Sequence, residues 1–538
     1  MLDKNKVDYS LYLVTDSTML PPGTTLESQV EVALQNGVTL VQLREKETDT
    51  KVFIEQALKV QKLCHKFQVP LIINDRVDVA LAIDADGVHV GQDDMPIKMV
   101  RQLLGPDKII GWSVGHEHEV EQLAAMGPGG VDYVGLGMVY PTLTKKNPKK
   151  APMGPRGVSK LLDKLQSTKA EWCRTVAIGG LHPDNIPRVL YQVASSDGKR
   201  TLDGISVVSD IMASPDAGNA AQTLRALIDD ARFQYAEGLS PFTKEYSFEF
   251  ARKCVQQTTE VSPLVQHITN KVHQNFGANI TLALGSSPIM SEVEPEFEEL
   301  SQVPHATLLL NTGTVAPFST LLHAMRVYNA ARRPIVFDPV GYSATSTRLE
   351  LNNQLLAYGQ FACIKGNVGE ILSLADLNKG KMRGVDAGSV GSDISLCVEA
   401  TKIVAYRYRT VAVCTGQQDV IVDGTCGGTF RLSEGSAGGA SALPAVIVEA
   451  GEIPVMGKIT ASGCSLGSTI ACLVGSISDK QHLFHAVVTA VCLYKSAGKI
   501  ASERCHGSGS FQVELIDALD QLFTENHPEN WVANVSRI

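Results

Sequence analysis

Eight short apolar runs of strand length recur between residues 11 and 208. Segments in which apolar residues follow helical spacing separate most of them, for example Phe53–Phe67 and Ser159–Leu165. Apolar strands that alternate with helices indicate a parallel sheet buried on both faces, and eight of them predict a closed (β/α)8 TIM barrel. The runs are Leu11–Val14, Val38–Leu43, Leu71–Ile73, Gly87–Val90, Ile109–Val114, Val131–Leu136, Thr175–Ile178 and Gly204–Val208.

The same alternation of strands and helices resumes after residue 263, with runs at Thr307–Leu310, Pro334–Phe337, Phe361–Ile364 and Thr410–Cys414. It predicts an open α/β sheet with helices on both faces and ligands at the carboxyl ends of the strands. Residues 232–250 between the two parts show no steady apolar periodicity, and 538 residues are too many for one core. We predict domains over residues 1–235 and 251–538, joined by a linker over 236–250.

Composition narrows the class of protein. The net charge of −9 argues against a nucleic-acid partner or an anionic membrane surface. The N-terminus has no signal-like apolar region, and no window is apolar for the roughly 18 residues that span a bilayer. The eleven cysteines are odd in number and form no C-x-x-C pair, which is typical of a reducing compartment. We expect a cytoplasmic enzyme.

Polar residues follow the apolar runs of the first half, where TIM barrels place their active sites. Backbone N–H groups of a Gly179-Gly180 turn can approach a phosphate, and Asp75 and Asp94 are oxygen ligands suited to Mg²⁺. With basic residues beside them, these groups indicate a diphosphate substrate that meets a monophosphate substrate. Alternatives stay open for single residues: Asp75 could cap the next helix, and His89 reads as a core histidine. The candidate site residues at these run ends are Gln42, Arg44, Lys46, Asn74, Asp75, Asp94, Ser113, Thr142, Thr144, Lys145, Gly180, Val208 and Ser209.

Residues from about 9 to 228 resemble thiamine-phosphate synthase. The resemblance is carried by Q-L-R-E-K from Gln42, N-D from Asn74, D-G-V-H-V-G-Q-D-D-M, P-T-x-T-K and G-I-S-V-V-S. It implies that 4-amino-5-hydroxymethyl-2-methylpyrimidine diphosphate is coupled to 4-methyl-5-(2-hydroxyethyl)thiazole phosphate with release of pyrophosphate. A thiazole tautomerase that shares this barrel is the alternative, and the retained basic and acidic residues favour the synthase.

The resemblance also implies roles for the residues. Gln42, Arg44, Lys46 and Asn74 bind the pyrimidine diphosphate, and Asp75 and Asp94 bind Mg²⁺. Lys46, Ser113 and Lys145 act in catalysis, the last two on the leaving diphosphate. Thr142, Thr144, Gly180, Val208 and Ser209 bind the thiazole phosphate.

In the second half, Thr460–Gly467 is a run of small residues that leads into an apolar stretch. Exposed N–H groups at such a helix start form an anion hole, where we expect a lowered pKa to let Cys464 deprotonate a substrate hydroxyl. A packing site with a buried thiol is the alternative. The spacing of Gly451, Gly457 and Lys458 does not fit a P-loop. Upstream strand ends carry Asp338, Lys365, Glu370 and Thr415, which predict a magnesium-nucleotide site.

Residues 255–525 resemble hydroxyethylthiazole kinase, a branch of the ribokinase-like kinases. The resemblance rests on H-I-T-N-K-V from His267, G-S-S-P-I-M, D-P-V-G, K-G-N-x-x-E and S-G-C. It implies that Asn270, Val272 and Met290 line the thiazole pocket and that Lys365, Thr415 and Gly463 contact ATP. By the same resemblance Asp338 and Glu370 hold Mg²⁺, and Cys464 is catalytic at the transferring phosphoryl group.

Two features depart from the kinase pattern. Ala461 stands where that family usually has glycine, so a left-handed backbone there would be strained. Residues 424–451 form a longer segment than usual, which we interpret as a lid or an assembly element. The kinase family forms trimers that share active sites between subunits, so the resemblance implies a homo-oligomer.

The two resemblances support each other, because the kinase makes the thiazole phosphate that the synthase consumes. Together they imply a bifunctional enzyme of thiamine biosynthesis with small-molecule substrates. The alternatives are an inactive thiamine-sensing scaffold and a second half that phosphorylates the pyrimidine.

Overall fold

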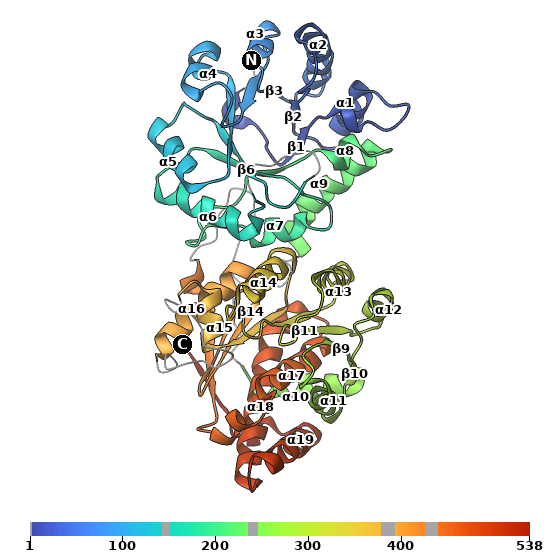
Figure 1. Cartoon of the computed structure of the whole chain (residues 1–538), viewed down its shortest axis with the longest axis vertical. Helices are drawn as coiled ribbons and strands as arrows, with labels where there is room; N and C mark the ends of the chain where they lie inside the picture. Colours follow the sequence, from blue (N-terminus) through green and yellow to red (C-terminus); the bar gives the residue numbers. More distant parts are fainter. Residues whose placement is uncertain (1–2, 143–150, 235–245, 378–392, 426–438) are drawn as a thin grey trace. The chain divides into compact units, whose positions relative to one another are not determined.

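The computed structural model describes residues 3–142, 151–234, 246–377, 393–425 and 439–538 (Figure 1). The chain divides into two compact units between helices α9 (Ala217–Gln234) and α10 (Phe248–Val261). Residues 236–245 of the predicted linker lie outside the described residues, and Phe248–Phe250 already belong to α10. The exact domain boundaries therefore stay predictions. In the part of the chain that the structure describes, no helix is long and apolar enough to cross a membrane.

The first unit is a closed barrel of eight parallel strands, in which each strand pairs with the next and β8 pairs with β1. This confirms the predicted TIM barrel. The strands are β1 (Leu11–Val14), β2 (Leu40–Leu43), β3 (Leu71–Asn74), β4 (Gly87–Val90), β5 (Ile109–Val114), β6 (Tyr133–Gly137), β7 (Arg174–Ile178) and β8 (Gly204–Val207).

Helices surround these strands, as Figure 1 shows. Every residue of β1, β2, β3, β4 and β8 is buried, because the helices cover the outer face and side chains fill the interior. The helices are α1 (Leu26–Gln35), α2 (Thr50–Lys66), α3 (Val77–Ala82), α4 (Ile97–Leu104), α5 (Glu117–Met126), α6 (Gly154–Ser167), α7 (Ile186–Gln192), α8 (Ser209–Met212) and α9.

The second unit is an open sheet in the order β10-β9-β11-β12-β13-β14-β15-β16-β17. The strands from β10 to β14 are parallel, and β15, β16 and β17 continue the sheet in antiparallel fashion. The fold class is therefore confirmed: an α/β domain follows the barrel. The strands are β9 (Leu264–Ile268), β10 (Ser287–Ile289), β11 (Thr307–Asn311), β12 (Ile335–Asp338), β13 (Cys363–Asn367), β14 (Val411–Thr415), β15 (Asp419–Asp423), β16 (Ala445–Glu449) and β17 (Asn534–Arg537).

Strand β16 lies inside the segment 424–451, which we interpreted as a lid or an assembly element. The described end of that segment is instead part of the sheet, where β16 pairs with β15 and β17. The sequence shows no alternation of apolar and polar residues in this strand, because Ala445–Val448 is buried throughout. Residues 426–438 of the segment lie outside the described residues.

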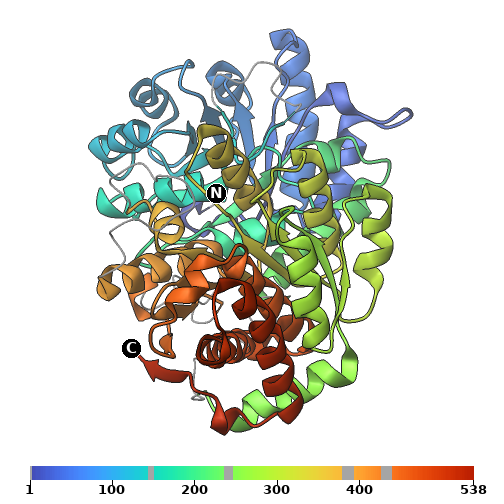
Figure 2. The ribbon, with the colours of Figure 1, turned by 60° about the horizontal axis from the view of Figure 1, so that its bottom comes forward.

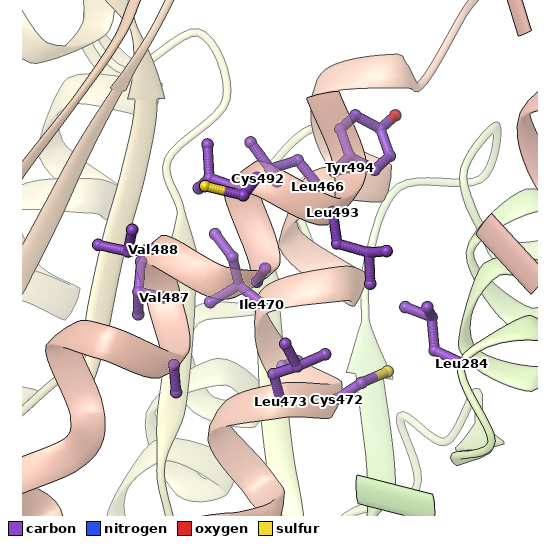
Figure 3. Packing of buried hydrophobic residues seen from close by; sticks show 14 of the residues in the cluster. Leu284, Leu466, Ile470, Cys472, Leu473, Val487, Val488, Cys492, Leu493 and Tyr494 are labelled. Carbon is purple, nitrogen blue, oxygen red and sulfur yellow. The ribbon is translucent and has the colours of Figure 1, made fainter. Parts of the chain in front are cut away.

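Helices α17 (Ser462–Ser476) and α18 (Leu483–Arg504) form the centre of the second unit's core. Figure 3 shows apolar side chains of both helices, such as Ile470 and Leu493, packed closely together. Helix α19 (Ser508–Glu525) packs beside α18, as both views of the ribbon show (Figures 1 and 2). The remaining helices are α10, α11 (Gln274–Ala283), α12 (Phe297–Gln302), α13 (Phe318–Ala330), α14 (Ser346–Tyr358), α15 (Val368–Leu374) and α16 (Ile394–Tyr408).

Candidate active sites

One cation and two carboxylates meet where β2, β3 and β4 of the barrel end. Lys46 Nζ lies 3.4 Å from Asp75 Oδ2, and Asp94 accepts a hydrogen bond from the Gly91 N–H at 2.7 Å. Burial and the neighbouring Asp94 carboxyl raise the pKa of Asp75 to about 6 against the pull of Lys46. Helix α3 begins at an N-cap residue, Arg76, without a side-chain cap, so Asp75 does not cap it.

This carboxylate pair has the donor set that Mg²⁺ prefers, since Mg²⁺ takes one or two protein carboxylates and completes its shell with waters and substrate phosphates. Within the described ranges, no group of three or more His, Cys, Asp or Glu side chains could hold a metal. The pair therefore fits a magnesium ion that takes the rest of its ligands from outside the protein.

Two further barrel residues are held by neighbouring strands. The Arg44 guanidinium contacts Asp16 at 3.3 Å, and its backbone N–H donates to Thr15 Oγ1 at 2.9 Å. Asn74 ends β3 and is buried. The structure thus brings Arg44 and Asn74 to the same end of the barrel as Lys46.

A hydrogen-bonded chain crosses the barrel interior between two predicted site residues. Gln42 Nε2 donates to Tyr12 Oη at 2.6 Å, and Tyr12 Oη lies 2.6 Å from Tyr133 Oη. His89 Nδ1 is 3.0 Å from Tyr133 Oη, and His89 Nε2 is 2.9 Å from Ser113 Oγ. Gln42 and Ser113 are therefore connected through three side chains that sequence reasoning did not place in the site.

Glycines shape the turn after β7. Both Gly179 (φ 99°) and Gly180 (φ 62°) adopt the left-handed conformation that favours glycine. A Cβ on Gly180 would lie 2.5 Å from the Pro141 carbonyl oxygen, so this turn packs tightly against the segment after β6. Asn185 Nδ2 donates to the Gly180 carbonyl at 2.9 Å and holds the turn in place.

The other residues predicted to bind the thiazole phosphate are placed in part. Val208 is the N-cap of α8 and Ser209 its first residue, directly after β8. Thr142 follows β6 and is half-buried. Thr144 and Lys145 lie outside the described residues, so their predicted roles stay predictions.

In the second unit, a buried polar cluster lies where β9, β11 and β12 end. Asn311 Nδ2 donates to Asp338 Oδ2 at 2.9 Å and lies 3.2 Å from Cys464 Sγ. Asn270 Nδ2 donates to Asn311 Oδ1 at 2.9 Å and lies 3.3 Å from Cys464 Sγ. Lys365 Nζ contacts Asp338 Oδ2 at 3.0 Å. Four predicted site residues thus meet around Asn311, which sequence reasoning missed.

The charges in this cluster are strongly perturbed. Burial raises the pKa of Asp338 although the Lys365 ammonium lowers it. Burial opposes the charge on Lys365, but Asp338, Cys464 and Glu370 together raise its pKa above the usual value, so Lys365 stays protonated. Oxygen Oδ1 of Asp338 is buried without a hydrogen-bond partner, a costly state for a carboxylate that a bound cation would relieve. The cluster therefore fits a magnesium ion.

The expectation that the pKa of Cys464 is lowered is wrong. Burial, reinforced by the Asp338 carboxylate, raises the pKa of this thiol to about 11. The partial charge at a helix N-terminus is small. It stabilises the thiolate by less free energy than the thiolate loses when it is removed from water. At neutral pH Cys464 is a thiol whose sulfur accepts hydrogen bonds from the side-chain amides of Asn270 and Asn311.

Glu370 joins two loops of the second unit. Its carboxylate accepts from the Gly341 N–H at 2.7 Å and from the Asn367 N–H at 2.8 Å, as part of the capping box of α15. Burial and the charge of Asp338 raise the pKa of Glu370 to about 7. Both carboxylate oxygens already accept backbone hydrogen bonds, so a cation would use their remaining lone pairs.

Helix α17 starts at a strained residue, as the sequence indicated. Ala461 is its N-cap and has φ 63°, ψ 9°, a left-handed conformation that costs an L residue about 1–2 kcal/mol. Gly463 follows within the first turn, is exposed, and leaves open space beside its Cα. The small residues therefore present backbone N–H groups at the helix start.

A second buried chain connects the loop after β9 to α17. Because a carbonyl only accepts, His267 Nδ1 donates to Val265 O at 3.0 Å, and His267 Nε2 accepts from Ser468 Oγ at 3.1 Å. Ser468 then accepts from His273 Nε2 at 3.2 Å, and His273 Nδ1 accepts from Thr269 Oγ1 at 3.0 Å. The chain fixes the loop that carries Asn270 against the helix that carries Cys464.

A buried ion pair holds the turn after β14. Lys495 Nζ on α18 donates to the carbonyls of Gly416 (3.0 Å) and Gln417 (2.6 Å) and lies 3.3 Å from Asp419 Oδ1. Asp419 in turn accepts from the Gly416 N–H at 2.8 Å. This turn directly follows Thr415, a predicted ATP contact.

Comparisons with known proteins identify both units. Residues 11–211 match the family described as thiamine monophosphate synthase, and residues 255–525 match the hydroxyethylthiazole kinase family. The thiamine biosynthetic bifunctional enzyme of Saccharomyces cerevisiae is 64% identical over 539 residues, which cover 99% of each chain. The chain belongs to the family of thiamine biosynthetic bifunctional enzymes.

Other relatives agree with this assignment. The probable thiamine biosynthetic bifunctional enzyme of Schizosaccharomyces pombe is 40% identical over 539 residues and 98% of each chain. The thiamine-phosphate synthase of Desulfitobacterium hafniense is 47% identical over 219 residues, which cover 40% of this chain and 96% of that protein. The barrel is thus a thiamine-phosphate synthase domain, and the second unit is a hydroxyethylthiazole kinase domain.

Of the three residues predicted to line the thiazole pocket, only one is buried. Asn270 is buried beside Cys464, but Val272 is 62% exposed and Met290 is half-buried after β10. Thr415 lies at the end of β14, where its hydroxyl contacts the Gly366 carbonyl at 3.3 Å. The ligand roles of these residues stay predictions.

Asn311 could have been found from the sequence. It is the polar residue that ends the apolar run of β11, just as Asp338 ends β12. Tyr12, Tyr133 and Lys495 gave no such signal, because each lies within an apolar strand or helix and reads as core.

Proposed function

We propose that the synthase domain couples 4-amino-5-hydroxymethyl-2-methylpyrimidine diphosphate to 4-methyl-5-(2-hydroxyethyl)thiazole phosphate, and that the kinase domain makes this thiazole phosphate from ATP and the free thiazole. The carrying observation is that each unit has its own cluster of opposite charges at the carboxyl ends of parallel strands: Lys46 with Asp75 and Asp94 in the barrel, and the buried pair of Lys365 with Asp338 in the second unit. Each cluster suits a phosphorylated ligand and a divalent cation.

In the barrel, Arg44 and Lys46 bind the pyrimidine diphosphate, and Asp75 and Asp94 hold Mg²⁺. When bound, that ion neutralises charge on the departing diphosphate. Lys46 and the Ser113 hydroxyl stabilise the same oxygens, which leaves a pyrimidine methylene cation that the thiazole nitrogen captures. The Gly179-Gly180 turn keeps the thiazole phosphate in place, so the chain supplies position and charge and needs no nucleophile.

In the kinase domain, Asp338 and Glu370 hold Mg²⁺, which neutralises nucleotide phosphate charge when bound. Lys365 and the backbone N–H groups at Gly463 donate hydrogen bonds to the phosphate oxygens. Asn270 and Cys464 position the substrate hydroxyl, and the protonated thiol makes Cys464 a positioning group and not a thiolate base.

We also propose a homo-oligomer: Val272, which is predicted to line the thiazole pocket, is 62% exposed in the single chain, and a second copy would cover it. The cytoplasmic location stays a prediction.

Product analysis tests the function. The full chain is incubated with ATP, Mg²⁺, hydroxyethylthiazole and the pyrimidine diphosphate, and one component is omitted at a time. We expect ADP without the pyrimidine, and thiamine phosphate with pyrophosphate only in the complete mixture. ADP without any thiamine phosphate would assign the barrel to the tautomerase or a binding module. Formation of neither product would favour an inactive sensor. In a further reaction the pyrimidine alcohol replaces hydroxyethylthiazole, and ADP formed there but not with hydroxyethylthiazole would favour a pyrimidine kinase.

A further inference from the structure

The chain of hydrogen bonds across the barrel uses one side chain from each of five strands. Tyr12 lies on β1, Gln42 on β2, His89 on β4, Ser113 on β5 and Tyr133 on β6. The tyrosines, Gln42 and His89 are buried, and the consecutive contacts span 2.6 to 3.0 Å. Ser113, half-buried, is the end that faces the predicted diphosphate.

The barrel backbone makes room for these side chains. A Cβ on Gly111 would lie 2.2 Å from Tyr133 Cζ and 2.5 Å from His89 Nδ1. A Cβ on Gly135 would lie 3.4 Å from His89 Cε1. Glycine weakens a strand, so its use at Gly111 indicates that the rings need this close approach.

The chain can carry its protons in only one direction. The Gln42 amide donates to Tyr12, so the single Tyr12 proton goes to Tyr133 and the single Tyr133 proton goes to His89 Nδ1. Nδ1 of His89 therefore accepts and carries no proton, so the ring is neutral and its single N–H is at Nε2. That N–H donates to Ser113 Oγ.

The far end agrees with this direction. Ser113 Oγ accepts from His89, and its own proton is then free to point out of the chain. A diphosphate has only acceptor oxygens at this point, so a serine that contacts it must donate. The Gln42 end and the Ser113 end thus require the same orientation, and a reversed chain would turn the Ser113 proton towards His89.

We propose that Tyr12, Tyr133 and His89 are positioning residues that turn the Ser113 hydroxyl into a fixed donor towards the leaving diphosphate and link it to Gln42. This proposal rests on the proposed role of Ser113. The three residues do not touch the reacting atoms, and each acts through the next. Removal of any link frees the Ser113 hydroxyl to rotate, which weakens a contact that matters most as the diphosphate departs.

A double-mutant cycle in the full-length protein tests this hydrogen-bonded row of Tyr12, Tyr133, His89 and Ser113, which we call the relay. Tyr133→Phe keeps the ring and removes the proton that His89 accepts, and Ser113→Ala removes the donor itself. We expect Tyr133→Phe to lower kcat of coupling about tenfold, less than the loss of a complete donor. In the Ser113→Ala background the same change should alter kcat less than about twofold, because no hydroxyl remains to orient.

Two controls accompany the cycle. Tyr9→Phe removes another buried barrel hydroxyl outside the relay and should leave kcat within about twofold. Hydroxyethylthiazole phosphorylation by the same samples reports an intact second domain, and circular dichroism reports the folded barrel. His89→Gln, which retains one donor and one acceptor, should retain more coupling than His89→Leu.

The outcomes separate the two hypotheses. Equal effects of Tyr133→Phe with and without Ser113, in an active chain, would contradict the relay and leave the function intact. A wild-type chain that forms no thiamine phosphate would contradict the proposed function and the relay together. If Tyr133→Phe unfolds the barrel, the cycle is run with Tyr12→Phe, for which the same non-additivity is expected.

Discussion

At the residue scale, burial decides the chemistry of the candidate sites more than sequence position does. Cys464 stands at a helix start, where a lowered thiol pKa was expected, yet burial and Asp338 raise that pKa to about 11. Asp338 pairs with Lys365 deep in the domain and leaves one carboxylate oxygen without a partner. The charged groups of this site are therefore the Lys365 ammonium and the Asp338 carboxylate, and the nearby Cys464 thiol is uncharged.

The raised pKa of Cys464 predicts slow alkylation. At pH 8 the thiolate fraction of this residue should be about 100-fold below that of a cysteine with pKa 9, since the shift is two units. We expect iodoacetamide to modify Cys464 far more slowly than the half-buried Cys505, as followed by mass spectrometry of quenched samples. Comparable rates at the two residues would show that the thiolate is stabilised after all.

At the element scale, buried polar side chains hold two loops of the kinase domain against helices. The chain from Val265 through His267, Ser468 and His273 to Thr269 fixes the loop after β9 to α17. A Cβ on Gly277 of α11 would lie 2.5 Å from the His273 ring, so that helix also leaves room for the chain. The Thr269 end of this hydrogen-bonded chain directly precedes Asn270, a predicted substrate contact, so the position of that loop depends on neutral histidines.

The histidine chain predicts a pH dependence of stability. Burial lowers the pKa of His267 to about 4 and that of His273 to about 3, below the unfolded value of 6.5. The unfolded state therefore binds more protons below pH 6.5, and the free energy of unfolding should fall as pH drops from 6.5 towards 4. Each histidine contributes roughly 1.4 kcal/mol per pH unit in that window.

Chemical unfolding of the kinase domain at several pH values measures this dependence. His273→Gln keeps an acceptor for Thr269 and a donor for Ser468 but does not titrate, so it should reduce the slope. His323→Gln alters a half-buried histidine outside this hydrogen-bonded chain and serves as the control. A slope that His273→Gln leaves unchanged would exclude His273 as its source.

The Lys495–Asp419 pair predicts a specific defect in nucleotide binding. Lys495→Met leaves the buried Asp419 carboxylate unpaired, which costs about 3–5 kcal/mol, and loosens the turn that follows Thr415. We expect a lower unfolding free energy and a higher KM for ATP, with a smaller change for hydroxyethylthiazole. Kinase assays and denaturant unfolding measure both.

Lys499→Met is the control on the same helix. Its partner Glu503 is exposed, so the loss should stay below about 1 kcal/mol and the ATP KM should not change. Adding Asp419→Asn to Lys495→Met should recover part of the stability, because the amide carries no charge. Equal KM changes for both substrates would mean that the pair supports the domain generally and not the nucleotide turn.

At the scale of the whole molecule, two compact units each have their own core and their own charged cluster. The barrel closes around Tyr12, Tyr133 and their neighbours, and the kinase domain packs around α17 and α18. The predicted Mg²⁺ ligands of the barrel, Asp75 and Asp94, lie in the first unit, and those of the kinase domain, Asp338 and Glu370, lie in the second. The two activities should therefore be separable by single substitutions.

Asp75→Ala should lower thiamine phosphate formation at least 100-fold and leave hydroxyethylthiazole phosphorylation within about twofold. Asp338→Ala should abolish most hydroxyethylthiazole phosphorylation. It should leave thiamine phosphate formation within about twofold when the thiazole phosphate is supplied directly. The two assays are run on the same purified variants. Parallel loss of both activities in a folded variant would contradict independent sites.

Much of the fold follows from local pattern. Leu11–Val14 and Gly87–Val90 are strands with the expected bounds, and the polar ends of β2, β3 and β12 carry the expected residues. The pattern succeeds there because a parallel strand covered by helices needs a continuous apolar run. It did not reveal β15 and β16, because no described α-helix separates β14 from β15 or β15 from β16 to mark the alternation. It did not reveal β17 either, because this edge strand is short and mostly exposed and so carries no apolar run.

The sequence by itself determined that there are two domains, their fold class and the carboxylates at strand ends. Only the tertiary structure decided which buried polar residues act together. Tyr12 and Tyr133 are 121 residues apart, and Asn311 and Cys464 are 153 apart. Their hydrogen bonds and pKa shifts depend on burial and distance in three dimensions, which no local pattern of apolar and polar residues encodes.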